Sequence, residues 1–145
     1  MTDKDRHRNN HKKAGKPWQL ELFSRSIKKK AKFRELISIM EGLERKTCLD
    51  IGCGTGVISY HLRYMGGDWS SIDSESSCVQ ETKDLVKNKV YKRDALHTGF
   101  RKNKFDIIVT FYIIEHIEDD DAFLKEMRRI LKSNGSLYIS TPNTG

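Results

Sequence analysis

The sequence lacks any apolar run near the roughly 20 residues that a membrane-spanning helix needs. Residues 1–16 contain no apolar core of the kind that a secretory signal requires. The three cysteines, Cys48, Cys53 and Cys78, form no Cys-x-x-Cys pair and leave an odd count, which predicts a reduced, cytoplasmic protein. No cluster of potential ligands has metal-site spacing, so we expect no bound metal.

Acidic residues are scarce at one end of the chain. Residues 1–34 hold twelve Lys and Arg against three Asp and Glu, a net charge of +9, whereas the remainder carries −2. The polar stretch 1–16 predicts a disordered basic arm ahead of one domain at 17–145. Such an arm can contact nucleic acid or an anionic surface, or it can be a solvated tail. The tail is favoured, since no aromatic residues alternate with the cations.

One string, Cys48–Gly56, combines an apolar run with alternating glycines. Thr47–Ile51 predicts a buried strand, and the chain from Thr55 onward predicts a helix with one apolar side. The glycines between them permit positive φ and a close approach of ligand to backbone. A strand, a glycine turn and a helix N-terminus together predict a ligand cradle at the carboxyl edge of a sheet.

The glycine spacing narrows the choice of ligand. A dinucleotide fingerprint needs G-x-G-x-x-G, and the third glycine would fall at Val57. The observed Leu-Asp-Ile-G-x-G-x-G resembles the first motif of class I S-adenosylmethionine-dependent methyltransferases. The alternatives are a Rossmann-like turn with no ligand or with another nucleotide. The resemblance implies cofactor contacts from six positions, Asp50, Gly52, Cys53, Gly54, Thr55 and Gly56.

An acid closes the second predicted strand, Trp69–Asp73. Asp73 lies seventeen residues after Gly56, close to the separation at which Rossmann-type folds place an acid on ribose hydroxyls. A carboxylate suits this role because it accepts from both vicinal hydroxyls. Asp73 and Ser74 are therefore candidate ribose ligands. The alternative is that either residue only caps the helix that follows.

A short third strand beginning at Val90 leads to Asp94 and Ala95. An acid followed by a small residue at this place resembles the adenine site of the same family. The resemblance implies that the carboxylate accepts from the exocyclic amine and that the next backbone N–H reaches a ring nitrogen. A turn-forming aspartate is the alternative.

The nearly continuous apolar run Phe105–Phe111 predicts a central parallel strand buried on both faces. Asp106, near its start, is predicted to be structural because it lies away from the ligand edge. The following segment, 111–117, resembles the segment after strand four in small-molecule methyltransferases of the type 11 group. The resemblance places Phe111 beside the methyl donor. His116 is the candidate general base, and helix capping or packing in the site wall is its alternative.

The remaining apolar periodicity completes the predicted fold. A leading helix from Leu20 towards Gly42 either covers the cofactor or packs in the core, and Gly66-Gly67 ends the helix after the glycine loop. A helix starting at Asp119–Asp121 is stopped by Asn134-Gly135, and Ser136–Ser140 predicts the fifth strand. The fold class is α/β, a doubly wound Rossmann-like parallel sheet in the order 3-2-1-4-5 with helices on both faces.

The family resemblance also implies what the sequence does not contain. A complete class I fold continues past the fifth strand with a helix and an antiparallel strand pair, so the C-terminal strands are predicted to be missing here. An unpaired fifth strand predicts self-association through Ser136–Ser140.

The predicted function is S-adenosylmethionine-dependent methyl transfer to a small-molecule acceptor by in-line displacement. The alternatives are a non-catalytic cofactor-binding module and an RNA-directed methyltransferase that uses the basic arm. The absence of an Asn-Pro-Pro-Tyr type motif after strand four counts against methylation of base amino groups.

Overall fold

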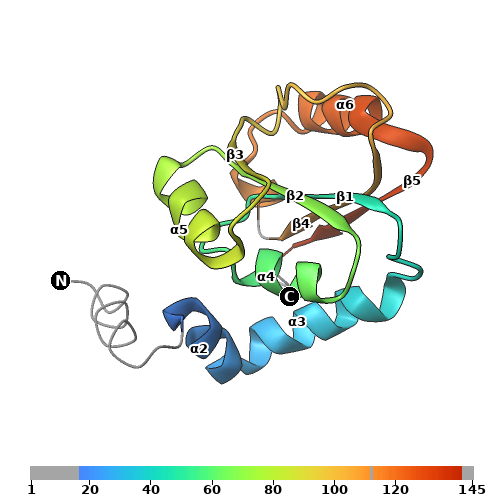
Figure 1. Ribbon diagram of the computed structural model, residues 1–145. Helices are drawn as coiled ribbons and strands as arrows, with labels where there is room; N and C mark the ends of the chain where they lie inside the picture. The colour runs from blue at the N-terminus through green and yellow to red at the C-terminus, as the bar shows by residue number, and fades with distance from the viewer. Residues whose placement is uncertain (1–16, 112, 142–145) are drawn as a thin grey trace.

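Five parallel strands form a single sheet in the computed structural model, which describes residues 17–111 and 113–141 (Figure 1). The strand order is β3-β2-β1-β4-β5, which confirms the predicted doubly wound topology. The strands are β1 Thr47–Ile51, β2 Asp68–Asp73, β3 Val90–Lys92, β4 Phe105–Phe111 and β5 Leu131–Ser140.

Helices cover both faces of this sheet (Figure 1). They are α2 Trp18–Arg25, α3 Ile27–Ile39, α4 Val57–Tyr64, α5 Ser76–Val86 and α6 Asp120–Ile130, with a 3-10 turn, η1, at Ile114–His116. The core on one face comes from α2, α3 and α4, and the core on the other from α6. α5 packs beside α4 and against β2 and β3.

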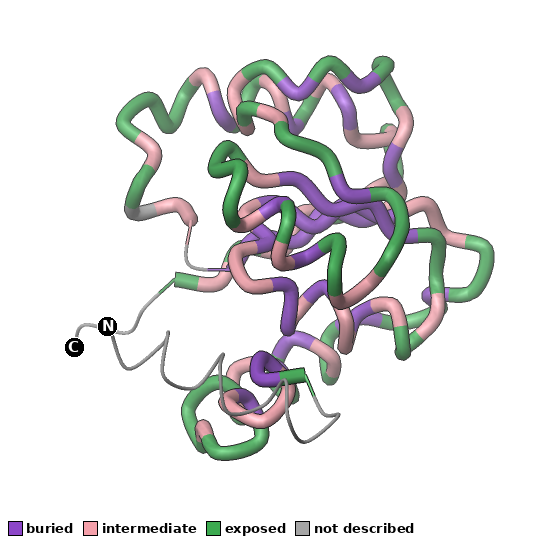
Figure 2. The backbone as a smooth tube through the Cα atoms, turned by 60° about the vertical axis from the view of Figure 1, so that its left-hand side comes forward, coloured by how far each residue is buried: buried purple, intermediate pink, exposed green. Residues whose placement is uncertain are grey.

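The two central strands are buried on both sides, and most of their residues are apolar. Successive side chains alternate between the faces. Cys48 and Val109 join the core beneath α3 and α4, while Leu49 and Ile108 join the core beneath α6. Figure 2 shows this buried backbone running through the middle of the molecule.

The predicted leading helix is two helices, so that prediction was wrong in one respect. Ser26 has extended backbone dihedrals (φ −95°, ψ 103°) between α2 and α3. Its hydroxyl accepts a hydrogen bond from the backbone N–H of Lys29 at 3.3 Å. Serine caps a new helix at this point because its side chain satisfies an N–H that the helix leaves unpaired. α3 then ends at Ile39, before Gly42.

The predicted stop at Asn134-Gly135 is also wrong, because α6 ends at Ile130 and β5 begins at the next residue. Phe105 pairs with Leu131 but Ile107 pairs with Ser136, so β5 contains an irregular stretch between them. A Cβ on Gly135 would lie 2.7 Å from Leu131 Cδ1. Glycine at a strand irregularity and glycine at a helix end look alike in a sequence, and only the pairing separates them.

The helical pair α2–α3 is joined to α4 by an aromatic cluster around His61. The His61 ring lies 4.5 Å from the Phe23 ring and 5.6 Å from the Phe33 ring, centroid to centroid. Its Nε2 is buried and accepts or donates no hydrogen bond within the described ranges. Burial lowers the pKa of His61 because the charged imidazolium is poorly solvated there.

Acid should therefore loosen the packing of α2 and α3 on α4. The pKa of His61 in the folded protein lies below its ordinary value of 6.5. The neutral imidazole therefore stabilises the folded protein above about pH 6.5. That support is lost as pH falls through the lower folded pKa. We expect His61→Phe to lose less thermal stability than the parent between neutral pH and about pH 5. The exposed His97→Gln is the matched control, and an unchanged loss in His61→Phe contradicts the prediction.

Candidate active site

A cavity of about 390 Å³ opens at the carboxyl edge of the sheet. This is where open parallel sheets bind ligands, next to the point at which the strand order reverses between β1 and β4. Its walls come from the ends of β1 and β2 and from the segments after β3 and β4. They comprise Ile51, Gly52, Ile72, Asp73, Ser74, Arg93, Asp94, Ala95, Leu96, Ile113, His116, Ile117, Glu118 and Asp119.

The glycine loop between β1 and α4 is tied to the end of β2. The backbone N–H groups of Gly52 and Cys53 donate to Ile72 O at 2.9 and 3.1 Å. The N–H of Gly54 donates to Asp73 Oδ2 at 3.0 Å. Gly52 has a φ of +75°, and a Cβ there would lie 3.0 Å from Ile113 Cδ1. Glycine is therefore needed where the loop forms the cavity wall.

Asp73 holds the loop and also faces the cavity region. Besides Gly54, its carboxylate accepts from the N–H of Glu75 through Oδ1 at 2.9 Å. The N-cap position of α5 is Glu75, so neither Asp73 nor Ser74 is the cap residue itself. An ionised carboxylate has about four acceptor sites. Two are used here, which leaves capacity for a ligand's hydroxyls.

Asp94 and Ala95 line the same cavity from the segment after β3. Asp94 Oδ1 accepts from the N–H of Leu96 at 2.9 Å, which is the turn-forming bond that sequence reasoning offered as its alternative role. The turn and the cavity position coexist, because the bond uses only one carboxylate oxygen. The fold thus brings Asp73 and Asp94 to one wall, although they are far apart in sequence.

Asp50 lies elsewhere, buried beneath the loop. Its Oδ2 accepts from the hydroxyl of Ser59 and, at 3.0 Å, from that of Ser71. Burial raises the pKa of Asp50, and the two hydroxyls and the guanidinium of Arg63 oppose that rise. Arg63 also donates to Ser71 Oγ at 2.8 Å. This network joins β1, α4 and β2, so Asp50 positions the elements around the cavity and does not line it.

Sequence reasoning missed the partners of Asp50. Ser59 and Arg63 stand one helical turn apart in α4, which is a detectable spacing. Ser71 comes from β2, and nothing in the sequence marks it, because it meets Asp50 only through strand pairing.

The other predicted cofactor residues do not line the cavity, and Cys53 and Gly56 pack against Thr82 beneath the glycine loop. Cys53 is buried, its Sγ accepts from Thr82 Oγ1 at 3.3 Å, and burial raises its pKa to about 12. Thr82 Oγ1 also donates to Gly54 O at 3.1 Å. A Cβ on Gly56 would lie 2.8 Å from Thr82 Cα. Thr55 does not line the cavity, and Phe111 is buried in the core on the α3 side.

Gly56→Ala and Gly54→Ala form a matched pair that isolates the contact with Thr82. Both positions have positive φ, +90° and +54°, and a substitution at either costs roughly 1–3 kcal/mol in backbone strain. A Cβ on Gly54 meets nothing within 4 Å. We expect Gly56→Ala to lower the free energy of unfolding by about 1–3 kcal/mol more than Gly54→Ala. Urea unfolding measures both, and equal losses would exclude the steric explanation.

His116 reaches the cavity from η1, just after β4. Its side chain is exposed, and its backbone N–H donates to Ile113 O at 2.9 Å. Arg93, which sequence reasoning missed, also lines the cavity. Its guanidinium lies 4.4 Å from the Phe100 ring centroid and donates to Thr98 O at 2.8 Å. These contacts fix the Arg93 guanidinium next to Asp94 in the chain, and no sequence motif indicates this position.

Asp106 sits at the other edge of the sheet, as predicted. It accepts from the N–H of Thr47 at 2.8 Å and from Lys132 Nζ at 3.1 Å. These contacts, the Thr47 bond first, lower the pKa of Asp106. Residues 17–111 and 113–141 contain no group of three side chains that could bind a metal. No helix among them is both long enough and apolar enough to cross a membrane.

Comparison with known proteins agrees with this geometry. A family model described as a methyltransferase domain matches residues 49–139, from β1 to the end of β5. The chain belongs to this family. It is a class I S-adenosylmethionine-dependent methyltransferase domain of the type 11 group, and the matched range contains the glycine loop, both cavity acids and η1.

Relatives with the same domain are longer. A ubiquinone biosynthesis O-methyltransferase of Pelagibacter ubique is 37% identical over 99 residues, which cover 66% of this chain and 41% of that enzyme. Its namesake in Histophilus somni is 30% identical over 116 residues, covering 70% of this chain and 47% of that enzyme. The chain therefore spans less than half the length of these relatives.

Solved structures agree on the fold. The PH0226 protein of Pyrococcus horikoshii superimposes with a TM-score of 0.71 at 23% identity, over 79% of this chain and 58% of that one. A Haemonchus contortus phosphoethanolamine N-methyltransferase in complex with S-adenosylhomocysteine gives 0.68 at 19% identity, over 78% and 26%. The Rossmann-like sheet is thus the shared part of these proteins.

Proposed function

We propose that this chain binds S-adenosylmethionine and transfers its methyl group to a small-molecule acceptor. One observation carries the proposal: a single cavity beside the glycine loop joins Gly52, Asp73, Asp94 and His116. Family membership supports the cofactor, and the names of the O-methyltransferase relatives support a hydroxyl as the acceptor. The proposed domain spans 17–145, with the basic arm 1–16 outside the described residues.

The cavity suits this cofactor in size and polarity. Its volume of about 390 Å³ falls within the range of small-ligand sites. Asp73 accepts from the ribose hydroxyls, and the second oxygen of Asp94 accepts from the exocyclic amine of adenine. The N–H of Ala95 serves a ring nitrogen. Gly52 and Gly54 let the cofactor approach the backbone, because no Cβ intervenes.

The protein contributes positioning, exclusion of water and proton removal to the methyl transfer. S-adenosylmethionine, when bound, supplies an activated methyl group on a sulfonium. The residues of this chain hold donor and acceptor in line, and they exclude water. His116 would accept the proton of the acceptor hydroxyl, while the bound cofactor would supply the methyl group and leave as S-adenosylhomocysteine. An imidazole suits this step because its unprotonated ring nitrogen can accept a proton.

The two acids should contribute to affinity in distinguishable ways. A hydrogen bond to a charged group contributes roughly 1.5–3 kcal/mol, so Asp73→Ala should weaken S-adenosylhomocysteine by about tenfold to a hundredfold or more. Asp94→Asn should weaken the adenine ligand but spare its inosine analogue, because the new amide can donate to the ring carbonyl. Calorimetry measures each Kd.

The exposed Asp84→Asn is the matched control, and it should bind like the parent. NAD should not bind, since Val57 stands where the dinucleotide motif needs glycine. Tight NAD binding, or an Asp73→Ala variant that binds like the parent, would refute the cofactor assignment.

The catalytic role of His116 is tested by turnover. His116→Gln should lower kcat by about a hundredfold to ten-thousandfold. The Kd of S-adenosylhomocysteine should not change. Formation of S-adenosylhomocysteine with a panel of phenols and catechols is the measurement. Cofactor binding without turnover on any acceptor would instead identify a binding module.

We also propose three properties of the whole chain, namely nucleic-acid binding, self-association and location in the cell. If residues 1–16 bind nucleic acid, RNA affinity should fall as salt rises and should be lost when residues 1–16 are deleted.

Weak self-association through the edge of β5 is supported by the place of β5 at the end of the sheet, and sedimentation measures it. A cytoplasmic location is supported by three free cysteines, and cell fractionation tests it.

A further inference from the structure

The segment after β3 carries Asp94 and Ala95, and it folds into a tight turn. The backbone N–H of His97 donates to Asp94 O at 3.1 Å, and the N–H of Leu96 donates to Asp94 Oδ1 at 2.9 Å. Asp94 and His97 also form an isolated antiparallel bridge. These bonds join the four residues into one unit. Whatever fixes the next residue, Thr98, therefore helps to fix the orientation of Asp94.

Thr98 attaches this turn to the rest of the domain and is only 1% exposed. Its N–H and its hydroxyl both donate to Glu126 Oε1 of α6, at 3.2 and 2.7 Å. Its carbonyl oxygen accepts from the Arg93 guanidinium at 2.8 Å, and its hydroxyl oxygen accepts from the N–H of Phe100 at 3.3 Å. Every polar group of Thr98 is thus paired, and the four bonds together hold the residue in one orientation.

Glu126 is itself fixed in place. Its side chain is only 10% exposed. The Arg129 guanidinium donates to Glu126 Oε2 at 2.9 Å and to Oε1 at 2.6 Å. The bonds from Arg129 first, and then those from Thr98, lower the pKa of Glu126 to about 2. An ionised carboxylate only accepts, so the Thr98 hydroxyl has to donate to it. Such charge-assisted bonds are stronger than bonds between neutral groups.

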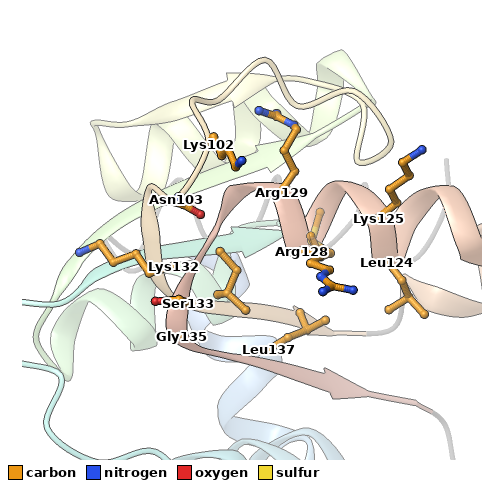
Figure 3. A pocket seen from close by; sticks show the side chains of 12 residues that line it. Lys102, Asn103, Leu124, Lys125, Arg128, Arg129, Lys132, Ser133, Gly135 and Leu137 are labelled. Atoms are coloured by element: carbon orange, nitrogen blue, oxygen red, sulfur yellow. The ribbon is translucent and has the colours of Figure 1, made fainter.

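Arg129 also joins α6 to the far end of the connection between β3 and β4. Its carbonyl oxygen accepts from the N–H of Asn103 at 3.0 Å. Figure 3 shows the Arg129 side chain extending from α6 on the side of Lys102 and Asn103, away from Leu137 of β5. α6 therefore contacts this connection at two places, at Thr98 and at Asn103. A segment that is already ordered loses less conformational freedom when a ligand binds to it.

We propose that Glu126 is a positioning residue for the adenine ring of the cofactor. Through Thr98 it holds the turn that presents the Asp94 carboxylate and the Ala95 N–H to the base. This inference rests on the proposed function, because it takes adenine as the ligand of Asp94. Glu126 does not line the cavity. Its effect on affinity therefore passes through the orientation of the turn, and it should largely disappear once Asp94 no longer makes its contact.

The test is a double-mutant cycle in the full chain, with calorimetry of S-adenosylhomocysteine. Glu126→Ala should raise the Kd about tenfold. Glu126→Gln keeps one acceptor for Thr98, so its Kd should lie between those of the parent and of Glu126→Ala. In an Asp94→Asn background, Glu126→Ala should raise the Kd by less than about threefold, because the contact that it positions is already lost. Without ligand, the amides of Leu96 and His97 should exchange hydrogen faster in Glu126→Ala than in the parent.

Asp106→Ala is the matched control. Asp106 is also a partly buried acid, it accepts hydrogen bonds from Thr47 and Lys132, and it lies at the opposite edge of the sheet. The control should lower the melting temperature, as Glu126→Ala does, yet it should leave unchanged both the Kd and the exchange of the two turn amides. A merely structural role for Glu126 would affect the two variants alike.

Three outcomes would overturn the inference. A parental Kd in Glu126→Ala means that the turn is positioned without Glu126. Losses that multiply fully in the double variant mean that Glu126 acts independently of Asp94. An equal rise of Kd in Asp106→Ala assigns the loss to general loosening of the fold. If the parent itself fails to bind S-adenosylhomocysteine, the proposed function is refuted instead. The exchange rates, measured without ligand, then still decide whether Glu126 holds the turn, and unchanged rates in Glu126→Ala exclude it.

Discussion

The site depends on the tether between the end of β2 and the glycine loop. Ile72 O receives two loop amides, and the Asp73 carboxylate receives a third from Gly54. These three loop amides find no partner within the loop itself, and leaving them unpaired in a partly buried place is costly. The neighbouring strand satisfies them, so the loop keeps one shape. A preformed loop costs less to order when a ligand binds.

A second layer keeps that tether in register. Asp50 joins Ser59 of α4 to Ser71 of β2, and Arg63 returns from α4 to the same serine. A buried carboxylate is tolerated here because two hydroxyls and a nearby guanidinium stabilise its charge. On the other side of the loop, Thr82 of α5 closes the gap beneath Gly56. The loop is thus held by β2, α4 and α5 together, and close packing requires glycine at Gly52 and Gly56.

Sequence reasoning succeeded where a residue's role depends on its neighbours along the chain. The apolar run of β4, the glycine spacing and the acids that end successive strands are all local patterns, and the fold order follows from them. It failed where one residue type has two uses. Gly135 was taken as a helix stop but lies in an irregular strand, and Ser26 divides a helix that periodicity alone joins. Asp50 was grouped with the cavity residues because it belongs to the motif, yet its side chain points into the core network.

The sequence by itself determined the strand order, the family and the place of the cavity at the carboxyl edge of the sheet, because hydrophobic period and glycine spacing act over a few residues. Only the tertiary structure decided which motif residues face that cavity. It also decided which of them pack beneath the loop. These outcomes depend on side chains from elements far apart in the chain. Strand register and helix packing bring these side chains together, and neither can be predicted from the local sequence.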